Sequence, residues 1–364
     1  MKSPTQSRRE FIGTLATAGA VVTYVGGSSS RGATERKIKL GIDNFAVRAM
    51  NWKADALIDY AAKLKTDSLL ISDLNAFTNH EESYLKGLRK KAADLGLQIQ
   101  LGTWSICPTS KTFKKDWGTA EEHLALGIRM AHTLGSPVIR VVLGSGEDRK
   151  SAGGIEARIE DTVKVCQKLK TQAVDAGVKI AVENHAGDLQ SWELVQLITA
   201  AGKDFVGANM DSGNATWTLE DPMTSLEILG PYALTTSLRD SAVWESEKGV
   251  TVQWTAMGEG TVDMKAYFKR FAELCPNVPV HVETISGFNR EIPYLDPGFW
   301  TTFPKARASD FAKFVALAKK GKARAPHQHP PGSDGKLAEQ EYQQAEIERS
   351  IKNCKTLFGL GEKS

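Results

Sequence analysis

Cysteine is scarce in this chain of 364 residues, and its four copies stand far apart. They are Cys107, Cys166, Cys275 and Cys354, and no two of them form a CxxC pair. Disulfide frameworks and zinc–thiolate sites need regularly or closely spaced cysteines. The sequence therefore predicts neither, and we expect the four thiols to act as small buried hydrophobic side chains.

Two further absences narrow the class of protein. No run of about 20 apolar residues follows the N-terminal region, so the body of the chain is not expected to span a membrane. The net charge is only +3, and residues 1–33 carry four basic residues and one acidic residue, which leaves 42 of each in the remainder. A neutral body lacks the clustered positive charge of a nucleic-acid-binding surface, so nucleic acid is not an expected partner.

The N-terminus has the pattern of an export signal. Residues 7–12 read Ser-Arg-Arg-Glu-Phe-Ile, and a modest apolar, small-residue stretch follows from Phe11 to Gly27. Paired arginines before such a stretch are typical of twin-arginine signals. We therefore predict that residues 1–33 are recognised by the twin-arginine export machinery and direct the protein to the periplasm. Cleavage near Ala33, a retained membrane tether and an ordinary N-terminal anchor helix stay open as alternatives.

The body alternates between two kinds of hydrophobic pattern. Short runs rich in valine, isoleucine and leucine predict strands at 38–43, 68–72, 98–103, 137–143, 179–184, 205–211, 233–239 and 278–284. Amphipathic segments predict helices at 52–64, 81–95, 119–134, 155–176, 191–202, 222–230, 262–275 and 307–319. Eight strands that alternate with eight helices favour a closed (β/α)8 TIM barrel over an open α/β sheet.

We assign the barrel to residues 37–320 and a Pro/His-rich linker with a C-terminal helix to residues 321–364. The run from Gly144 to Glu147 does not complete the GxGxxG spacing, so it is interpreted as a loop and not as a dinucleotide site. His327 and His329 lie in the proline-rich stretch and are interpreted as solvated linker residues.

Acidic residues end three of the predicted strands. Glu183, Asp211 and Glu283 follow the apolar runs at 179–184, 205–211 and 278–284. Active sites of TIM barrels lie at the carboxyl ends of the strands, so the three carboxylates are expected to converge. A divalent cation would offset their mutual repulsion and could polarise a substrate carbonyl. The pattern therefore predicts a metal site formed by these three residues, in which carboxylates could also move protons on and off carbon.

Five short motifs resemble one family. They are VENH (182–185), NMDSGN (209–214), RD (239–240), GEG (258–260) and HVET (281–284). Together they closely resemble the xylose-isomerase-like superfamily of sugar isomerases and epimerases, over about residues 37–318. The resemblance implies one divalent metal (Mn, Zn, Co, Fe or Mg) held by Glu, Asp, His and Glu from strands five to eight. It also implies that Glu183 and Glu283 flank the substrate as an acid/base pair.

The sequence departs from the family at one ligand. The family has a histidine two residues before the Lys-Asp or Arg-Asp pair of the seventh strand, where this chain has Ser237. Serine is a poor ligand for such a metal, so water, Gln253 or a substrate oxygen would have to fill the position. Weaker metal affinity and a degenerate site are therefore open alternatives.

Four residues are predicted to contact the substrate. His185 could touch it or shuttle a proton, Arg239 could hold a hydroxyl, carbonyl or carboxylate, and Gln253 could form part of the pocket wall. Trp104, at the end of the third strand, could pack against a sugar face, although core packing is an equal alternative. His281 points inward below Glu283 and is interpreted as a residue that orients a ligand.

The leading functional hypothesis is a metal-dependent isomerase or epimerase of an unphosphorylated sugar or related polyol. A lyase or dehydratase acting on a keto-sugar or keto-inositol would use the same site and the same proton abstraction. A nuclease with this barrel would need a multi-metal site with many histidines, which the body lacks. A non-catalytic exported sugar-binding barrel is the alternative from outside the enzymes. By family analogy the barrels could also pair as a homodimer.

Overall fold

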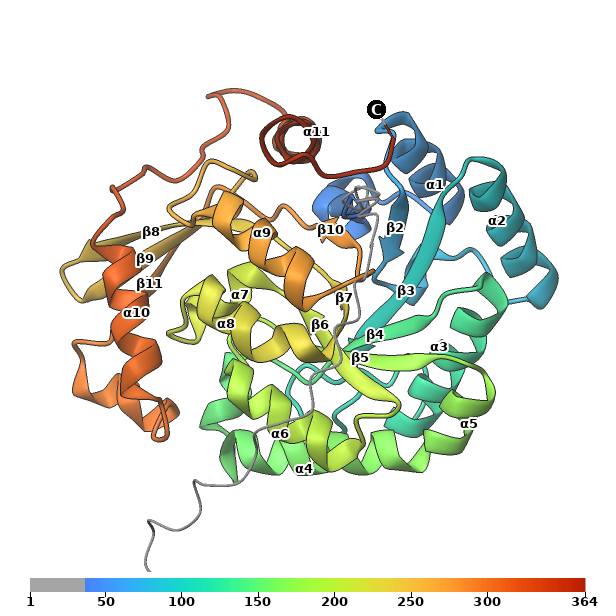
Figure 1. Ribbon diagram of the computed structural model, residues 1–364, viewed down its shortest axis with the longest axis horizontal. Helices are drawn as coiled ribbons and strands as arrows, with labels where there is room; N and C mark the ends of the chain where they lie inside the picture. Colours follow the sequence, from blue (N-terminus) through green and yellow to red (C-terminus); the bar gives the residue numbers. More distant parts are fainter. Residues whose placement is uncertain (1–36, 364) are drawn as a thin grey trace, which may run out of the picture. The chain divides into compact units, whose positions relative to one another are not determined.

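Eight short parallel strands form the central sheet of the protein (Figure 1). The computed structural model describes residues 37–363, and the predicted export segment 1–33 lies outside them. The strands are β1 (Leu40–Asp43), β2 (Ser68–Ile71), β3 (Gln98–Ser105), β4 (Val138–Val142), β5 (Lys179–Glu183), β6 (Val206–Met210), β7 (Ala233–Thr236) and β10 (Val280–Val282). β1, β2, β4 and β6 are buried throughout, as expected for parallel strands covered on both faces.

The sheet curls into a ring. The strand order runs from β10 through β1 to β7, and β1 pairs with β10 in parallel, with Leu40 opposite Val280. Leu238 joins the two ends of the ring: its N–H donates to the carbonyl of His281 at 2.7 Å, and its carbonyl accepts from the N–H of Glu283 at 2.9 Å. The predicted eight-stranded barrel is confirmed, and this junction brings the residues after β7 beside Glu283.

The helices follow the predicted positions closely. They are α1 (Ala54–Lys63), α2 (Glu82–Asp94), α3 (Ala120–Leu134), α4 (Gly154–Lys168), α5 (Lys170–Asp175), α6 (Ser191–Ala201), α7 (Ser212–Trp217), α8 (Pro222–Leu229), α9 (Met264–Leu274), α10 (Ala308–Ala318) and α11 (Gly335–Phe358). Short 3₁₀ helices occupy 44–50, 74–76, 146–150, 230–232 and 297–302. The segment predicted as one helix at 155–176 is two helices that meet at Leu169.

An antiparallel sheet of three strands, which the sequence analysis did not predict, extends one side of the barrel (Figure 1). Its strands are β8 (Asp240–Ser246), β9 (Gly249–Thr255) and β11 (Asn289–Ile292), in the order β11-β9-β8. Val243 and Val252 from this sheet share a small hydrophobic core with Phe314 of α10. The extension matters for function because it places Trp254, near the end of β9, at the barrel mouth.

The C-terminal helix α11 packs on the barrel. Ile347, Ile351 and Cys354 are buried in the main hydrophobic core, and the hydroxyl of Ser350 accepts from the N–H of Met257 at 3.1 Å. The described residues, 37–363, accordingly belong to one compact unit. All four cysteines are buried and free, as expected. Among residues 37–363 there is no helix with the length and apolar character needed to cross a membrane.

Candidate functional site

Three carboxylates meet at the carboxyl end of the barrel. Glu183 is the last residue of β5, Asp211 directly follows β6, and Glu283 directly follows β10. One oxygen from each lies within 4.8 Å of the others, which is the spacing of a possible metal site. The barrel geometry therefore brings together the three residues that the sequence predicts as metal ligands.

Glu183 is held by donors on β4, β6 and α7. Its Oε2 accepts from Arg140 Nε at 2.5 Å and from Asn209 Nδ2 at 2.7 Å, and its Oε1 lies 3.3 Å from Asn214 Nδ2. Arg140 comes from the middle of β4 and also donates to the carbonyl of Thr103 at 2.9 Å. Glu183 is fully buried and does not line the cavity described below. It lies beneath the cavity floor, where it anchors Arg140.

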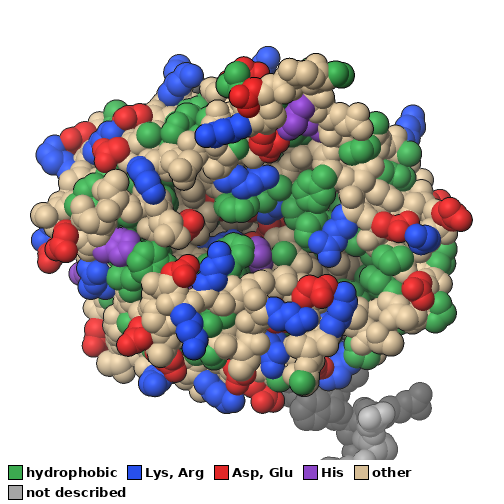
Figure 2. All heavy atoms as spheres, turned by 180° about the vertical axis from the view of Figure 1, so that it is seen from behind, with side chains coloured by type: hydrophobic (Ala, Val, Ile, Leu, Met, Phe, Trp, Pro, Cys, Tyr) green, Lys and Arg blue, Asp and Glu red, His purple; other side chains and the backbone are tan. Residues whose placement is uncertain are grey.

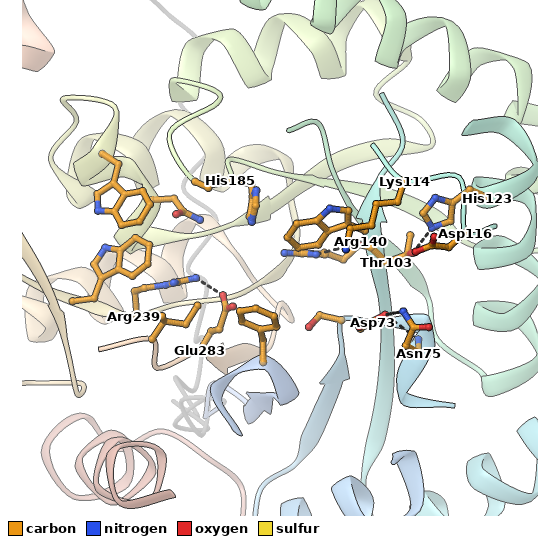
Figure 3. Close-up of a pocket in the computed structure, with 18 of the residues that line it drawn as sticks. Asp73, Asn75, Thr103, Lys114, Asp116, His123, Arg140, His185, Arg239 and Glu283 are labelled. Atoms are coloured by element: carbon orange, nitrogen blue, oxygen red, sulfur yellow. Dashed lines mark hydrogen bonds and ion pairs between the residues drawn. The ribbon is translucent and has the colours of Figure 1, made fainter. Parts of the chain in front are cut away.

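Arg239 connects the other two carboxylates. Its Nη2 donates to both Asp211 Oδ2 and Glu283 Oε2. Its guanidinium carbon lies 4.2 Å from the centroid of the Trp254 ring, a cation–π geometry. Figure 3 shows the side chain reaching across the floor of the pocket toward Glu283. The predicted substrate-binding arginine thus sits among the predicted metal ligands.

Ser237, in the position of the family histidine, is engaged elsewhere. Its hydroxyl donates to Asp43 Oδ2 at 3.0 Å and accepts from Asn209 Nδ2 at 3.2 Å. These bonds join the ends of β1, β6 and β7 below the three carboxylates. The hydroxyl therefore serves the hydrogen-bond network of the barrel.

Burial dominates the electrostatics of the site. Desolvation raises the pKa of Asp211 to about 7 and that of Glu283 well above its usual value, although Arg239 opposes both shifts. The same cause raises the pKa of Asp43, against the opposing charge of Arg140. For the two arginines burial disfavours the charged form, but the surrounding carboxylates outweigh it and raise the pKa. Both guanidinium groups therefore stay charged.

These contacts decide how well the site fits a divalent metal. The three acids have the right spacing, but Arg239 Nη2 bridges Asp211 and Glu283, and Arg140 Nε is bonded to the third. An ion placed between the carboxylates would lie against a guanidinium that carries the same sign of charge. The nitrogen ligand of the family is absent as well. As arranged, the residues do not fit a divalent ion at this place.

A cavity of about 470 Å³ opens above the two arginines. The face seen in Figure 2 is hollowed near its middle, where hydrophobic and basic side chains and a histidine side chain are seen. Aromatic rings from two parts of the chain line the cavity: Phe45, Trp104 and Trp117 from the N-terminal half, and Trp217, Trp254 and Phe288 from the C-terminal half. Arg140, Arg239, Glu283 and His185 contribute the polar groups of its floor.

His185 has a defined tautomer. Its Nδ1 lies 2.6 Å from the carbonyl oxygen of Gly144, and because a carbonyl only accepts, Nδ1 carries the proton. Nε2 then bears the lone pair and makes no hydrogen bond to any described residue. The buried carboxylate of Asp188 fixes the loop by accepting from the N–H groups of His185 and Gly144 at 2.7 and 3.0 Å. Burial lowers the pKa of His185, which favours the neutral ring as a proton acceptor.

Trp104 and Gln253, the other two predicted substrate contacts, line different cavities. Trp104 lines the cavity, packs edge-on against His185 with centroids 5.2 Å apart, and donates its Nε1–H to the carbonyl of Thr112 at 3.0 Å. Gln253 lines a separate cavity of about 230 Å³ and donates to Asn289 and to the carbonyl of Ala325. The structure thus brings Trp104, His185 and Arg239 to one pocket and places Gln253 outside it.

His281 lies deeper in the barrel than the carboxylates. Its Nδ1 lies 3.3 Å from Thr235 Oγ1, and burial lowers its pKa to about 3, so the ring is neutral. It makes no hydrogen bond with Glu283, and its role in orienting that residue stays a prediction.

Sequence reasoning missed Arg140, Asn209 and Asn214. Arg140 had a signal, because a charged residue in the apolar run of β4 needs a buried partner of opposite charge. The two amides belong to the NMDSGN motif (209–214), but only the folded barrel shows that they reach Glu183.

Comparison with known proteins places this site in a class. The fold and the strand-end carboxylates define a TIM barrel with an enzyme-like pocket at its usual end. A family profile described as xylose isomerase-like TIM barrel matches residues 58–294, and the chain belongs to this family. A curated relative, 3-oxo-isoapionate decarboxylase from Pectobacterium atrosepticum, is 21% identical over 213 residues, which are 58% of this chain and 70% of that protein.

Two solved structures illustrate the shared fold. A D-psicose 3-epimerase, solved in the presence of D-fructose, has a TM-score of 0.56 at 12% identity and covers 88% of this chain and 100% of its own. The IOLI protein, with a bound zinc atom, has a TM-score of 0.54 at 16% identity and covers 79% and 100%. At these identities the likeness concerns the fold alone.

Proposed function

We propose that the protein is a sugar isomerase or epimerase that removes a proton from the carbon next to a carbonyl group of a carbohydrate. The observation that carries the proposal is the cavity floor, which Glu283 shares with two buried, charged guanidinium groups, one of which, Arg239, it contacts. Deprotonation next to a carbonyl creates an enediolate, whose negative charge needs fixed positive partners. Arg140 and Arg239 are placed to supply them.

The proposed roles follow from the groups that face the cavity. Arg140 Nη2 and Arg239 Nη1 make no hydrogen bond to the described residues, so they can donate to the oxygens of the substrate. Glu283 Oε1 and His185 Nε2 are likewise unpaired and can accept or return a proton on carbon or oxygen. Glu183, predicted as the second member of the catalytic pair, is fully bonded beneath Arg140. Its part in this proposal is to position that arginine.

The divalent metal predicted from the sequence stays a prediction. Three acids with suitable spacing and a zinc-containing structural neighbour favour it, whereas the contacts of Arg140 and Arg239 oppose it. When bound, such an ion would polarise a substrate oxygen. No step of the proposed reaction requires this.

The size and lining of the cavity bear on the substrate. Small-molecule sites are clefts of roughly 300–1,000 Å³, and a single hexose is a ligand at the small end of that range. The cavity of about 470 Å³ has room beyond a hexose, and much of its wall is aromatic, although Asp73, Lys114 and Asp116 also line it. We therefore favour a carbohydrate with a sugar ring over the arginines and a second ring or apolar group between the aromatic side chains.

A lyase is the second candidate, and the decarboxylase relative favours it. The same enediolate would expel a group from the neighbouring carbon: the oxyanion re-forms the C=O bond, the electrons of the enediolate C=C bond form a new C=C bond to that carbon, the bond to the leaving group breaks, and an acid protonates the departing group. The spare room in the cavity suits a substrate that carries such a group.

Exchange of solvent deuterium tests the isomerase and a lyase that eliminates through the enediolate, because both begin with the same proton abstraction. The protein is incubated in D₂O with a panel of aldoses, ketoses and keto-glycosides, and the proton next to the carbonyl is followed by NMR. We expect exchange in at least one compound, and Glu283→Gln should slow it by about 10²-fold or more. Glu291→Gln, an exposed acid on β11, is the control and should leave it unchanged.

Retention of every proton, together with calorimetric binding of a sugar, would contradict the enzymatic proposal. That result would favour the non-catalytic sugar-binding barrel.

We also propose that the protein is exported through the twin-arginine pathway. The support is the order of Ser7, Arg8, Arg9, Phe11 and Ile12 ahead of a small-residue stretch. Replacing Arg8 and Arg9 with lysine should leave the protein in the cytoplasm, as followed by cell fractionation. Unchanged fractionation would contradict the proposal.

A further inference from the structure

We infer that the guanidinium of Arg239 permanently takes the place of a divalent metal, so that this chain is a metal-independent member of its family. The inference rests on the proposed function only in using the same carboxylates. Metal content is measured without turnover, so the two proposals can fail separately.

The first argument is the removal of the fourth ligand. Ser237 replaces the family histidine, and its hydroxyl is used in both directions, as donor to Asp43 and as acceptor from Asn209. A metal ion would have to break this network to gain a weak neutral ligand. The substitution therefore removes a strong nitrogen ligand for the metal. The serine that replaces it takes part in the hydrogen bonds that join the strands of the barrel.

The second argument is that the chain has a built place for Arg239. Gly213, at the start of α7, has no side chain, and a Cβ there would collide with Cγ and Cδ of Arg239. On the other side the guanidinium stacks on Trp254, whose Nε1–H donates to the carbonyl of Gly213 at 3.1 Å. The backbone of Arg239 is fixed as well: its N–H and its carbonyl both bond to Ser212 Oγ, at 3.1 and 2.6 Å.

The third argument is what the guanidinium reaches from this place. Nη2 donates to both Asp211 and Glu283, the two carboxylates that would have to share an ion. Arg140, on β4, forms an ion pair with the third carboxylate, Glu183. Each of the three acids thus already has a cationic partner that is itself buried and cannot move into solvent. A metal could enter only if Arg239 left its cradle, which would expose Trp254 and leave a gap beside Gly213.

Elemental analysis and metal titration test the inference directly. Wild-type protein is dialysed against Mn²⁺ or Zn²⁺, desalted and analysed beside Asp211→Asn. We expect well below one equivalent of ion that depends on Asp211, and no change of Tm on adding EDTA or Mn²⁺. About one equivalent in the wild type that is lost in Asp211→Asn would overturn the inference. Ion kept in both proteins does not come from the three acids; His327 and His329, with ring nitrogens 3.3 Å apart, are an alternative source.

A gain-of-binding variant provides the second test. Ser237→His with Arg239→Ala restores the family ligand and removes the guanidinium, so it should bind one equivalent of Mn²⁺ or Zn²⁺ and gain Tm on metal addition. Arg149→Ala is the matched control, because it breaks another buried arginine–glutamate pair, with Glu193, outside the three acids. The Tm of this control should fall, and added Mn²⁺ or Zn²⁺ should not raise it again. If the double variant does not fold, the wild-type analysis still decides.

Discussion

Arg239 lies with its guanidinium carbon 4.2 Å from the ring centroid of Trp254 while its Nη2 bridges two buried carboxylates. The same ring stacks on Trp217 at 4.0 Å, and Arg290 covers the far side of Trp217 at 3.7 Å. The side chains of Arg290, Trp217, Trp254 and Arg239 therefore form one stack. It runs from the antiparallel sheet of β8, β9 and β11 to the floor of the pocket. It joins the part of the chain that the barrel pattern does not predict to the centre of the site.

Loss of the Trp254 ring should weaken the site more than the fold. Trp254→Leu removes a cation–π contact worth about 2 kcal/mol when desolvated, and it frees Arg239 to leave the carboxylates. We expect the deuterium-exchange rate to fall by roughly 10-fold. Trp192→Leu is the control, because its ring packs under Arg307 at 5.0 Å and outside the cavity. Equal effects of the two substitutions on exchange would contradict the role given to Trp254.

Arg140 should be essential for stability as well as for the reaction. Arg140→Met leaves the carboxylate of Glu183 buried without its cation, and breaking such a pair costs about 3–5 kcal/mol. Urea denaturation measures this loss, and the double variant with Glu183→Gln should recover part of it. Arg149→Met should cost a similar amount while preserving exchange. A stable Arg140→Met variant with full activity would contradict the assignment.

A buried acid far from the pocket gives the protein a pH-dependent stability. Burial raises the pKa of Glu220 to about 8, against the hydrogen bonds that it accepts from Ser191. The folded state thus binds the proton of Glu220 more tightly than the unfolded chain does, and this tighter binding raises the free energy of unfolding. This stabilisation is complete below about pH 4.5 and is lost as pH rises toward 8, by up to about 1.4 kcal/mol per pH unit.

Comparison with Glu220→Gln isolates this contribution. The stability of the wild type relative to this variant should fall between pH 5 and pH 8 in urea titrations. A constant difference would show that Glu220 ionises equally in both states.

The aromatic wall should select ligands by size. Trp217→Ala removes one face of the cavity near Phe288, with which Trp217 packs at 6.1 Å. Calorimetry should show weaker binding of a phenyl glycoside and little change for the free sugar, because the sugar ring is expected over the arginines. Equal weakening for both ligands would place the second group elsewhere.

The sequence allowed the barrel and three acids of the site to be predicted for a simple physical reason. Buried parallel strands are apolar on both faces, so polar residues such as Glu183 and Asp211 stand out where the strands end. The extension sheet was missed because residues 240–255 lack long apolar runs and depend on α10 for their core. Gln253 was expected in the pocket from its place beside Trp254. Neighbours along a strand point to opposite faces, however, and Gln253 lines the other cavity.

The positions of the two arginines could not be predicted from the pattern. Arg239 was expected to bind the substrate, and only the closure of the barrel at Leu238 shows that it reaches Glu283. Arg140 is set apart from its partner Glu183 by 43 residues. Contacts between strands of a barrel follow from register, which a single sequence does not display.

Anomalous diffraction from crystals soaked in Mn²⁺ would test the central claim most directly, because it locates an ion and the guanidinium in the same map. The account predicts density for Arg239 between Asp211 and Glu283, and no manganese peak there. A manganese peak shared by Glu183, Asp211 and Glu283, with Arg239 turned away from them, would contradict it.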